Sequence, residues 1–367
     1  MISKEPILSG YTYIRPLGSG GFTDVYLYQQ FNPVRDVAVK VLKAELNGIE
    51  RQLFITESNI MAACGMHPNV LNVYETGLSQ DGRLFIAMEK ADRTADEYLS
   101  GNKIDITTYL DTAVKIANAL EFVNEKGYLH RDIKPENILI DAFNTPKMAD
   151  FGVSCELAKV QQSPVSLSWG WASPEIMELG SHGSIQSDIY SFGISFYSIL
   201  TGANPFVQIA NSKMDKISNS AGVTETALKG KYREIMSKTV SHWEYQPLAT
   251  NGTPRQIDQI LSQALSFDPK KRQNSFLEIS QQFTTVQQQL GLTPTAISLG
   301  GVNSFNSASE SVFAPSKNNV SNNEINQMFN ASTVQTGTQR RTVSRTNLQT
   351  AKNSTKQKKS LFSKLFK

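Results

Sequence analysis

The stretch that decides the fold reads His130-Arg131-Asp132-Ile133-Lys134-Pro135-Glu136-Asn137, and Asp150-Phe151-Gly152 follows further along the chain. Two apolar runs between the motifs, Ile138-Leu139-Ile140 and Lys147-Met148-Ala149, predict paired strands that present both loops to one cleft. A solvated Asp/Asn turn is the plain alternative for any one of these residues. The complete string favours a site that holds a divalent metal ion beside a hydroxyl nucleophile.

The polar side chains of the two motifs have complementary chemistry. Asp132 can accept the proton of a hydroxyl group, and Lys134 can offset charge on a transferred group. Asn137 and Asp150 supply the hard oxygen ligands that Mg²⁺ prefers. We therefore predict Asp132 and Lys134 as catalytic groups and Asn137 and Asp150 as ligands of Mg²⁺, with Mn²⁺ as a possible substitute.

The composition permits a cytosolic enzyme of two lobes and a tail. The chain has 367 residues, and its formal net charge of +3 is too small for a general nucleic-acid binder. Cys64 and Cys155 have no metal-type spacing, which favours a reducing compartment. Residues 1–10 lack the pattern of an export signal, and the mostly apolar run 189–200 is too short for a membrane span, so it predicts a buried helix.

Short alternating segments up to about residue 89 predict a small sheet-rich lobe, and longer helical patterns over 107–283 predict a larger helical lobe. In the first lobe, a glycine-rich segment at 18–25 lies between two predicted strands. Its glycines would let backbone amides approach phosphate oxygens. A plain hairpin loop is the alternative.

A lysine and a glutamate in the first lobe each require a partner. Period-two alternation in the predicted strand 37–42 places Ala38 and Lys40 on one face. Glu57 lies within the apolar stripe of the predicted helix 50–65. Because burial of a single charge is costly, we predict a Lys40–Glu57 pair that orients the amine toward nucleotide phosphates. If the helix phase differs slightly, Glu57 is a surface residue instead.

Over about residues 10–285, these motifs resemble those of eukaryotic-type (Hanks-type) serine/threonine protein kinases of the bacterial branch. The landmarks in order are the glycine-rich loop Gly18-x-Gly20-x-Phe22-x-x-Val25, Val37-Ala38-Val39-Lys40, Glu57, the catalytic loop 130–137, Asp150-Phe151-Gly152, Ser173-Pro174-Glu175, Asp188 and Arg272. The resemblance implies an α+β, bilobal kinase fold. It also implies that Asp188 braces the catalytic loop and that Arg272 pairs with Glu175.

The resemblance further implies ATP as cofactor. It places Lys40 and Glu57 in the catalytic group, Met88 at the gatekeeper position, and the backbone of Glu89 and Ala91 against the adenine edge. Core packing is the alternative for the apolar members. The nucleotide-binding set is Gly18, Ser19, Gly20, Gly21, Phe22, Val25, Ala38, Lys40, Met88, Glu89 and Ala91.

The chain departs from the kinase pattern at several positions. Thr23 replaces the third glycine, although Gly21 adds freedom nearby. No threonine occurs between Gly152 and Ser173, so Ser163 and Ser166 become the candidate phosphorylation sites of the activation loop. Ser168 matches the threonine that contacts the catalytic aspartate and lysine in similar kinases.

Three further features concern substrate and regulation. Trp169 and Trp171 form either a bulky apolar floor for a substrate segment or part of the core. Arg131 predicts a cationic pocket that favours a phosphorylated activation loop. Residues 206–254 are more numerous than we expect for the family, and the helix-compatible part 227–240 predicts either a docking surface or a tolerated insertion.

The domain prediction has four parts: an N-terminal extension (1–10), the kinase domain (11–285, with lobes at about 11–91 and 92–285), a Ser/Asn/Thr/Gln-rich flexible linker (286–350), and a basic amphipathic segment (351–367). If the last segment forms a helix, its apolar side chains lie on one face and its lysines on the other. This pattern predicts that the segment attaches to the anionic inner face of the cell membrane. The apolar residues are Leu361, Phe362, Leu365 and Phe366. Docking on a protein, or an unstructured basic end, are the alternatives.

The main functional prediction is ATP-dependent transfer of the terminal phosphoryl group to serine or threonine of proteins, including the chain itself. A pseudokinase scaffold is the alternative, but Lys40, Asp132 and Asp150, one of which pseudokinases usually lack, are all present. A small-molecule phosphotransferase is disfavoured by Lys134 and Asp188.

Overall fold

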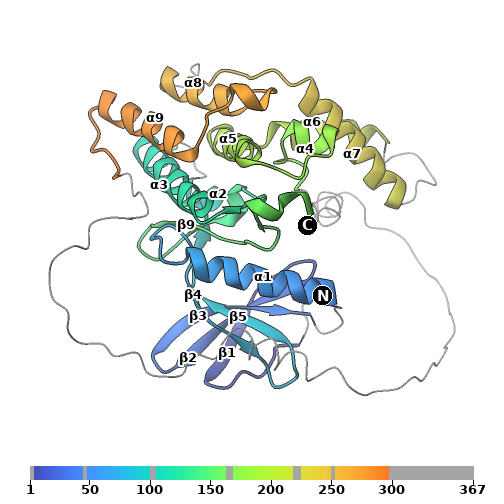
Figure 1. The fold of residues 1–367 in the computed structure, drawn as a ribbon, viewed down its shortest axis with the longest axis vertical. Helices are drawn as coiled ribbons and strands as arrows, with labels where there is room; N and C mark the ends of the chain where they lie inside the picture. The colour runs from blue at the N-terminus through green and yellow to red at the C-terminus, as the bar shows by residue number, and fades with distance from the viewer. Residues whose placement is uncertain are drawn as a thin grey trace, which may run out of the picture. The chain divides into compact units, whose positions relative to one another are not determined.

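A computed structural model describes residues 4–43, 48–99, 105–162, 168–217, 225–248 and 253–296. These all belong to one compact unit, residues 1–301, and form a sheet-rich lobe followed by a helical lobe (Figure 1). The C-terminal segment 351–367 and the candidate sites Ser163 and Ser166 lie outside the described residues.

The first lobe is built on one antiparallel sheet with the strand order β1-β2-β3-β5-β4. Alternation in β3 places Val37, Val39 and Val41 in a core with the tyrosines of β2, so Ala38 and Lys40 lie on the opposite face, as predicted. Helix α1 (Gly48–Cys64) lies between this sheet and the helical lobe (Figure 1). The strands are β1 (Tyr11–Ser19), β2 (Thr23–Phe31), β3 (Val34–Leu42), β4 (Val73–Leu78) and β5 (Leu84–Met88).

Short strands carry the loops of the predicted site. The apolar runs pair as predicted, with Ile138 opposite Met148 in an antiparallel ladder. This ladder continues to β6, and a second two-stranded ladder pairs β7 with β10. The bounds are β6 (Arg93–Thr94), β7 (Tyr128–Leu129), β8 (Ile138–Ile140), β9 (Pro146–Met148) and β10 (Cys155–Glu156).

Helix α5 (Ile185–Thr201) is the buried helix predicted from the apolar run. A capping box of Ser184 and Ser187 starts it, and Gly202 ends it in the left-handed conformation that glycine adopts easily. Its Phe192 stacks on Phe196 in the core of the helical lobe. No helix among the described residues is long and apolar enough to cross a membrane.

The other helices complete the second lobe. α3 packs along α9, and α6 packs beside α7, which covers the helix-compatible part of the predicted insertion (Figure 1). The folded segment extends past residue 285, because helix α9 continues beyond it. Further on, the Thr295 hydroxyl donates to Asp111 (2.9 Å). The bounds are α2 (Ala95–Leu99), α3 (Ile106–Glu125), α4 (Pro174–Leu179), α6 (Pro205–Ile217), α7 (Glu225–Ser241), α8 (Arg255–Ala264) and α9 (Phe276–Gln289), with 3₁₀ turns η1 (Pro135–Asn137), η2 (Leu157–Gln162) and η4 (Pro269–Lys271).

Candidate active site

The loop before β8 brings Asp132, Lys134 and Asn137 together. Lys134 Nζ lies 2.6 Å from Asp132 Oδ2, and Asn137 Nδ2 donates to the same oxygen (2.9 Å) and to the Asp132 carbonyl (2.8 Å). Asp132 Oδ1 is buried and has no hydrogen-bond partner among the described residues. An unpaired buried acceptor is costly, so this oxygen is suited to receive a hydroxyl donor. Lys134 also donates to Ser168 Oγ (3.0 Å), which is the lysine part of the contact that the resemblance implied for Ser168.

Asp188 on α5 fixes the start of this loop. Its carboxylate accepts the backbone N–H groups of His130 (2.8 Å) and Arg131 (2.9 Å), while Arg131 has a left-handed backbone with φ 67°. Burial raises the pKa of Asp188 to about 6, although the two amides favour its ionised form. The brace expected from the sequence is therefore present, and it stabilises an uncommon backbone conformation next to Asp132.

The imidazole of His130 joins the two motifs. It packs against Phe151 (ring centroids 4.7 Å apart), Nε2 bonds to the Ala149 carbonyl (3.1 Å), and Nδ1 accepts the Asp132 N–H (3.3 Å). Burial lowers the pKa of His130 to about 4, despite the nearby carboxylates. A neutral ring satisfies both contacts, so His130 holds the backbone at 132 and at 149 in fixed positions.

Lys40 contacts two acidic groups. Its Nζ lies 2.6 Å from Glu57 Oε1 on α1 and 2.9 Å from Asp150 Oδ1. Burial alone would lower the pKa of Lys40, but the charges of Glu57 and Asp150 outweigh it and raise that pKa. The Lys40 charge also lowers the pKa of Asp150 to about 2. The predicted pair is therefore formed, and Glu57 is buried rather than on the surface.

The predicted nucleotide-binding residues lie around Lys40 in the sheet. Val25 is opposite Lys40 in the β2–β3 ladder, and Ala38 is opposite Met88 in the β3–β5 ladder. Glu89 and Ala91 follow β5. Among the described residues, no backbone hydrogen bond involves the Glu89 carbonyl or the Ala91 amide. In the glycine-rich loop, Gly18 is opposite Val25 and Ser19 is opposite Asp24 in the β1–β2 ladder. At the tip of the loop, the Gly20 N–H donates to the Thr23 carbonyl (2.7 Å). Gly21 and Phe22 are exposed.

Sequence reasoning missed a polar network behind the connection between the lobes. The Glu89 carboxylate lies 3.0 Å from Lys147 Nζ and accepts Asn72 Nδ2 (3.3 Å). Lys147 is only 7% exposed although it lies on β9, shortly before the predicted metal-binding motif. The sequence feature that could have predicted this network is Lys147 itself, because a lysine within an apolar strand needs a charged partner. The carboxylate of Glu89 thus contacts protein groups, and its N–H donates to the Asn72 carbonyl (2.9 Å), so its backbone carbonyl is the group that remains for a ligand.

The donor set of Asn137 and Asp150 fits a magnesium ion. Both amide hydrogens of Asn137 point at Asp132, which leaves its Oδ1 as a ligand, and Lys40 bonds only one oxygen of Asp150. The Asp150 side chain is 46% exposed. Mg²⁺ commonly takes one or two protein oxygens and completes its shell with water and phosphate. Among the described residues, no cluster of three or more His, Cys, Asp or Glu side chains forms an all-protein metal site.

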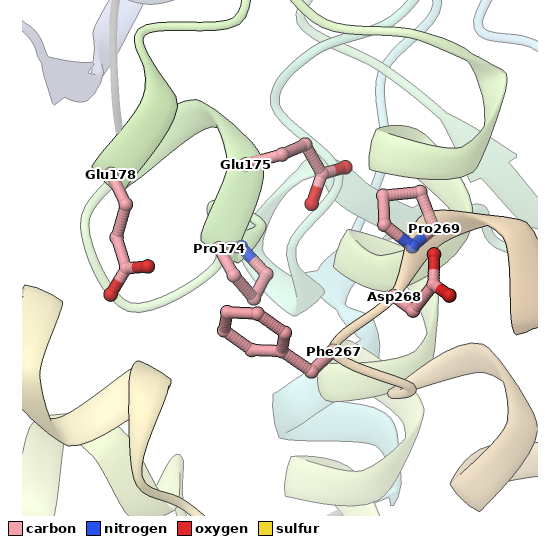
Figure 2. Close-up of a pocket in the computed structure, with 6 residues that line it drawn as sticks. All are labelled: Pro174, Glu175, Glu178, Phe267, Asp268 and Pro269. Carbon is pink, nitrogen blue, oxygen red and sulfur yellow. The ribbon is translucent and has the colours of Figure 1, made fainter.

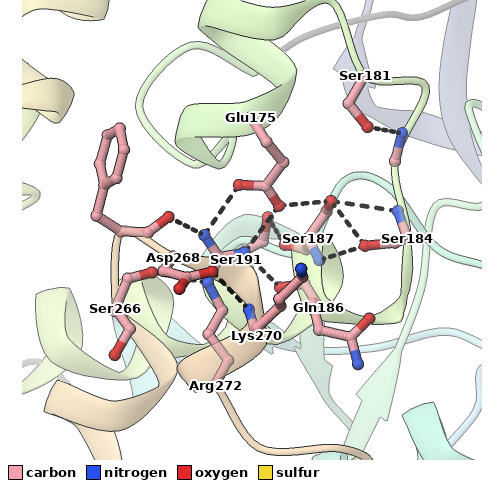
Figure 3. Close-up of polar contacts among 12 residues, drawn as sticks. Glu175, Ser181, Ser184, Gln186, Ser187, Ser191, Ser266, Asp268, Lys270 and Arg272 are labelled. Atoms are coloured by element: carbon pink, nitrogen blue, oxygen red, sulfur yellow. Dashed lines mark hydrogen bonds and ion pairs between the residues drawn. The ribbon is translucent and has the colours of Figure 1, made fainter.

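Glu175 and Arg272 form the predicted ion pair. Two parallel contacts of 2.8 and 2.9 Å join them, and Ser187 Oγ donates to the same carboxylate (2.9 Å) (Figure 3). Burial raises the pKa of Glu175, but Arg272 outweighs it and lowers that pKa overall. Beside the pair, a pocket is lined by Pro174, Glu175, Glu178, Phe267, Asp268 and Pro269 (Figure 2).

Trp169 and Trp171 lie just after Ser168 in the sequence. Both are partly exposed, and the guanidinium of Arg233 on α7 lies 5.4 Å from the ring centre of Trp169. Asn204 Nδ2 fixes Gly170 between them by donating to its carbonyl (2.6 Å). Arg131, the residue expected to form a cationic pocket, donates from Nε to the His182 carbonyl (3.0 Å). The predicted substrate floor and phosphate pocket stay predictions.

The protein-kinase domain model matches residues 11–284. The chain belongs to the protein kinase family. This kinase is 27% identical over 307 residues to serine/threonine-protein kinase PknK of Mycobacterium tuberculosis, covering 82% of this chain and 26% of PknK. It is 27% identical over 278 residues to PrkC of Bacillus subtilis (74% and 40%), and 32% identical over 204 residues to the probable kinase PknB of Lactococcus lactis (53% and 32%).

The kinase thus spans less than half the length of these curated relatives. The predicted bilobal fold is confirmed by the family match and by the five-stranded sheet that precedes the helical part. The predicted resemblance to bacterial serine/threonine protein kinases is confirmed as well.

Proposed function

We propose that this kinase uses ATP and Mg²⁺ to phosphorylate serine or threonine residues of proteins. The observation that carries the proposal is the unpaired, buried Oδ1 of Asp132, which lies in one loop with Lys134 and Asn137. Asp132 would orient the substrate hydroxyl and accept its proton, and Lys134 would offset negative charge on the transferred group. The names of the relatives support protein serine and threonine as substrates.

Lys40 would bind the phosphates of ATP, because Glu57 holds its amine beside Asp150. The adenine would lie between Val25 and Ala38 and meet the backbone of Glu89 and Ala91. Held by Asn137 and Asp150, Mg²⁺ would neutralise charge on the phosphates, and Mn²⁺ has the same ligand preference. Most of the rate enhancement would come from positioning and electrostatics.

Phosphoryl transfer tests this proposal directly. The purified kinase is incubated with ATP and Mg²⁺, and phosphorylated residues are identified by mass spectrometry. We expect phosphoserine or phosphothreonine, and a loss of about 10²–10⁴-fold in rate for Asp132→Asn. Asp96→Asn, at an exposed site on α2, is the control and should retain activity. Nucleotide binding without any transfer would favour the pseudokinase scaffold instead.

We also propose that residues 351–367 attach the kinase to an anionic membrane surface on the cytoplasmic side. Six lysines and no acidic residue occur there, with four large apolar residues at helical spacing near the end. Apolar insertion and lysine attraction would act together at such a surface.

Liposome flotation tests the attachment. The full chain should float with anionic vesicles, and a chain that ends before Lys358 should remain below. Leu365→Ser/Phe366→Ser keeps every lysine and should also lose binding, because attraction of the lysines alone would not replace apolar insertion. Equal recovery of all three proteins would contradict the proposal.

A further inference from the structure

A buried carboxylate lies inside the glycine-rich loop. Asp24 belongs to the segment 18–25 and lies near the start of β2, where it is fully buried and faces Ser19 in the β1–β2 ladder. The Ser19 hydroxyl donates to Asp24 Oδ1 at 2.5 Å. Such a carboxylate is costly to bury and repels phosphate groups placed nearby. Its charge must therefore be compensated if this loop is to cover a nucleotide.

Lys43, the residue after β3, supplies the compensation. Its Nζ lies 3.7 Å from Asp24 Oδ1 and donates to the carbonyls of Gly20 (2.5 Å) and Gly21 (3.4 Å). Its own backbone N–H donates to the Phe22 carbonyl (3.0 Å). One residue thus contacts three successive carbonyls of the loop as well as its buried acid.

These contacts set the direction of the loop amides. In a trans peptide unit the C=O and N–H groups point to opposite sides. Because the Gly20 and Gly21 carbonyls face Lys43, the N–H groups of Gly21 and Phe22 face away from it. Neighbouring amides that point away from a cation are available to an anion, as in other backbone phosphate sites.

We infer that Lys43 is a positioning residue for the phosphates of the nucleotide, distinct from Lys40. It neutralises Asp24 and turns the amides of Gly21 and Phe22 toward the bound polyphosphate. This role rests on the proposed function, because it requires that the kinase binds a nucleotide under the loop. It involves no contact between Lys43 and the nucleotide itself.

Binding of ADP·Mg²⁺ and of adenosine, measured by isothermal titration calorimetry, separates this role from general folding. Lys43→Met should weaken ADP binding about tenfold, the effect of losing one charge-assisted hydrogen-bond anchor, and leave adenosine within about twofold. Lys43→Arg keeps the charge and the donors and should bind ADP nearly as the unsubstituted kinase does. Lys115→Met, which breaks the Lys115–Asp111 pair on α3, is the matched control and should change neither ligand.

A double variant tests the electrostatic part. Asp24→Asn/Lys43→Met contains neither charge, and we expect it to bind ADP more tightly than Lys43→Met, in which the carboxylate is left beside the phosphates. Equal losses for ADP and adenosine in Lys43→Met, or no loss for either, would overturn the inference. If the unsubstituted kinase binds neither ligand, the proposed function itself is overturned and the inference with it.

Discussion

Lys40 is a nearly buried amine whose charge is retained because two carboxylates surround it. Its side chain is 13% exposed, and that of Glu57 is 4% exposed. Removing one partner of such a pair leaves a charge without compensation in a poorly solvated site, which costs several kcal/mol in typical proteins. The contact to Asp150 adds a link to the motif proposed to bind metal, so the position of α1 and the geometry of Asp150 depend on each other.

His130 predicts a pH effect on stability. Its pKa is about 4 in the folded protein and near 6.5 when unfolded, so the unfolded chain binds more protons between these values. The contribution of His130 to stability is complete above pH 6.5 and is lost as the pH falls toward 4. His130→Phe removes this effect, so the variant should gain on the order of 1–3 kcal/mol relative to the unsubstituted kinase across that window.

Urea unfolding of both proteins at pH 7 and at pH 4.5 measures this difference. Asp188, whose pKa is raised, shifts stability in the opposite direction, but it is present in both proteins and cancels in the comparison. A stability difference that stays constant between the two pH values would contradict a buried, neutral His130.

Between elements, the Glu175–Arg272 pair joins the start of α4 to the turn after α8. The Arg272 side chain is fully buried and that of Glu175 is 11% exposed. Arg272→Met should therefore cost about 3–5 kcal/mol in unfolding free energy, because it leaves Glu175 buried without its partner. Glu175→Gln/Arg272→Met should recover part of that loss. Denaturant titration measures both.

The pair Lys159–Glu156 offers a matched control for this prediction. Its side chains are 62% and 45% exposed, and its N–O distance of 2.8 Å equals that of the buried pair. Lys159→Met should cost less than about 1 kcal/mol, since exposed pairs contribute little. Similar losses for Arg272→Met and Lys159→Met would show that burial does not determine the strength of the Glu175–Arg272 link.

Elements with a strong local pattern were predictable from the sequence. Alternation located the face of β3 that carries Lys40, and the apolar stripe of α1 located Glu57. Contacts between distant segments were not predictable, because no local period encodes them. No motif predicts the contacts of Lys43 with the glycine-rich loop. The same is true of the Glu89–Lys147 pair and of the position of Arg233 beside Trp169.

At the scale of the described molecule, several polar contacts connect the two lobes across the site. Lys40 of the sheet meets Asp150, and Lys147 of β9 meets Glu89 at the connection between the lobes. Asn69 Nδ2 adds a hydrogen bond to the Pro146 carbonyl (2.8 Å). Some of these contacts use residues that we propose to bind the nucleotide or its metal, namely Lys40, Glu89 and Asp150, so a bound nucleotide should stabilise the whole domain.

The central claim is that Lys40, Asp132, Asn137 and Asp150 converge on one metal–nucleotide complex. The most direct test is anomalous diffraction from crystals of the kinase grown with Mn²⁺ and a non-hydrolysable ATP analogue. We predict a manganese peak at coordination distance from Asn137 Oδ1 and from the Asp150 carboxylate, with the phosphates beside Lys40. A nucleotide bound elsewhere, or manganese that contacts neither Asn137 nor Asp150, would contradict the claim.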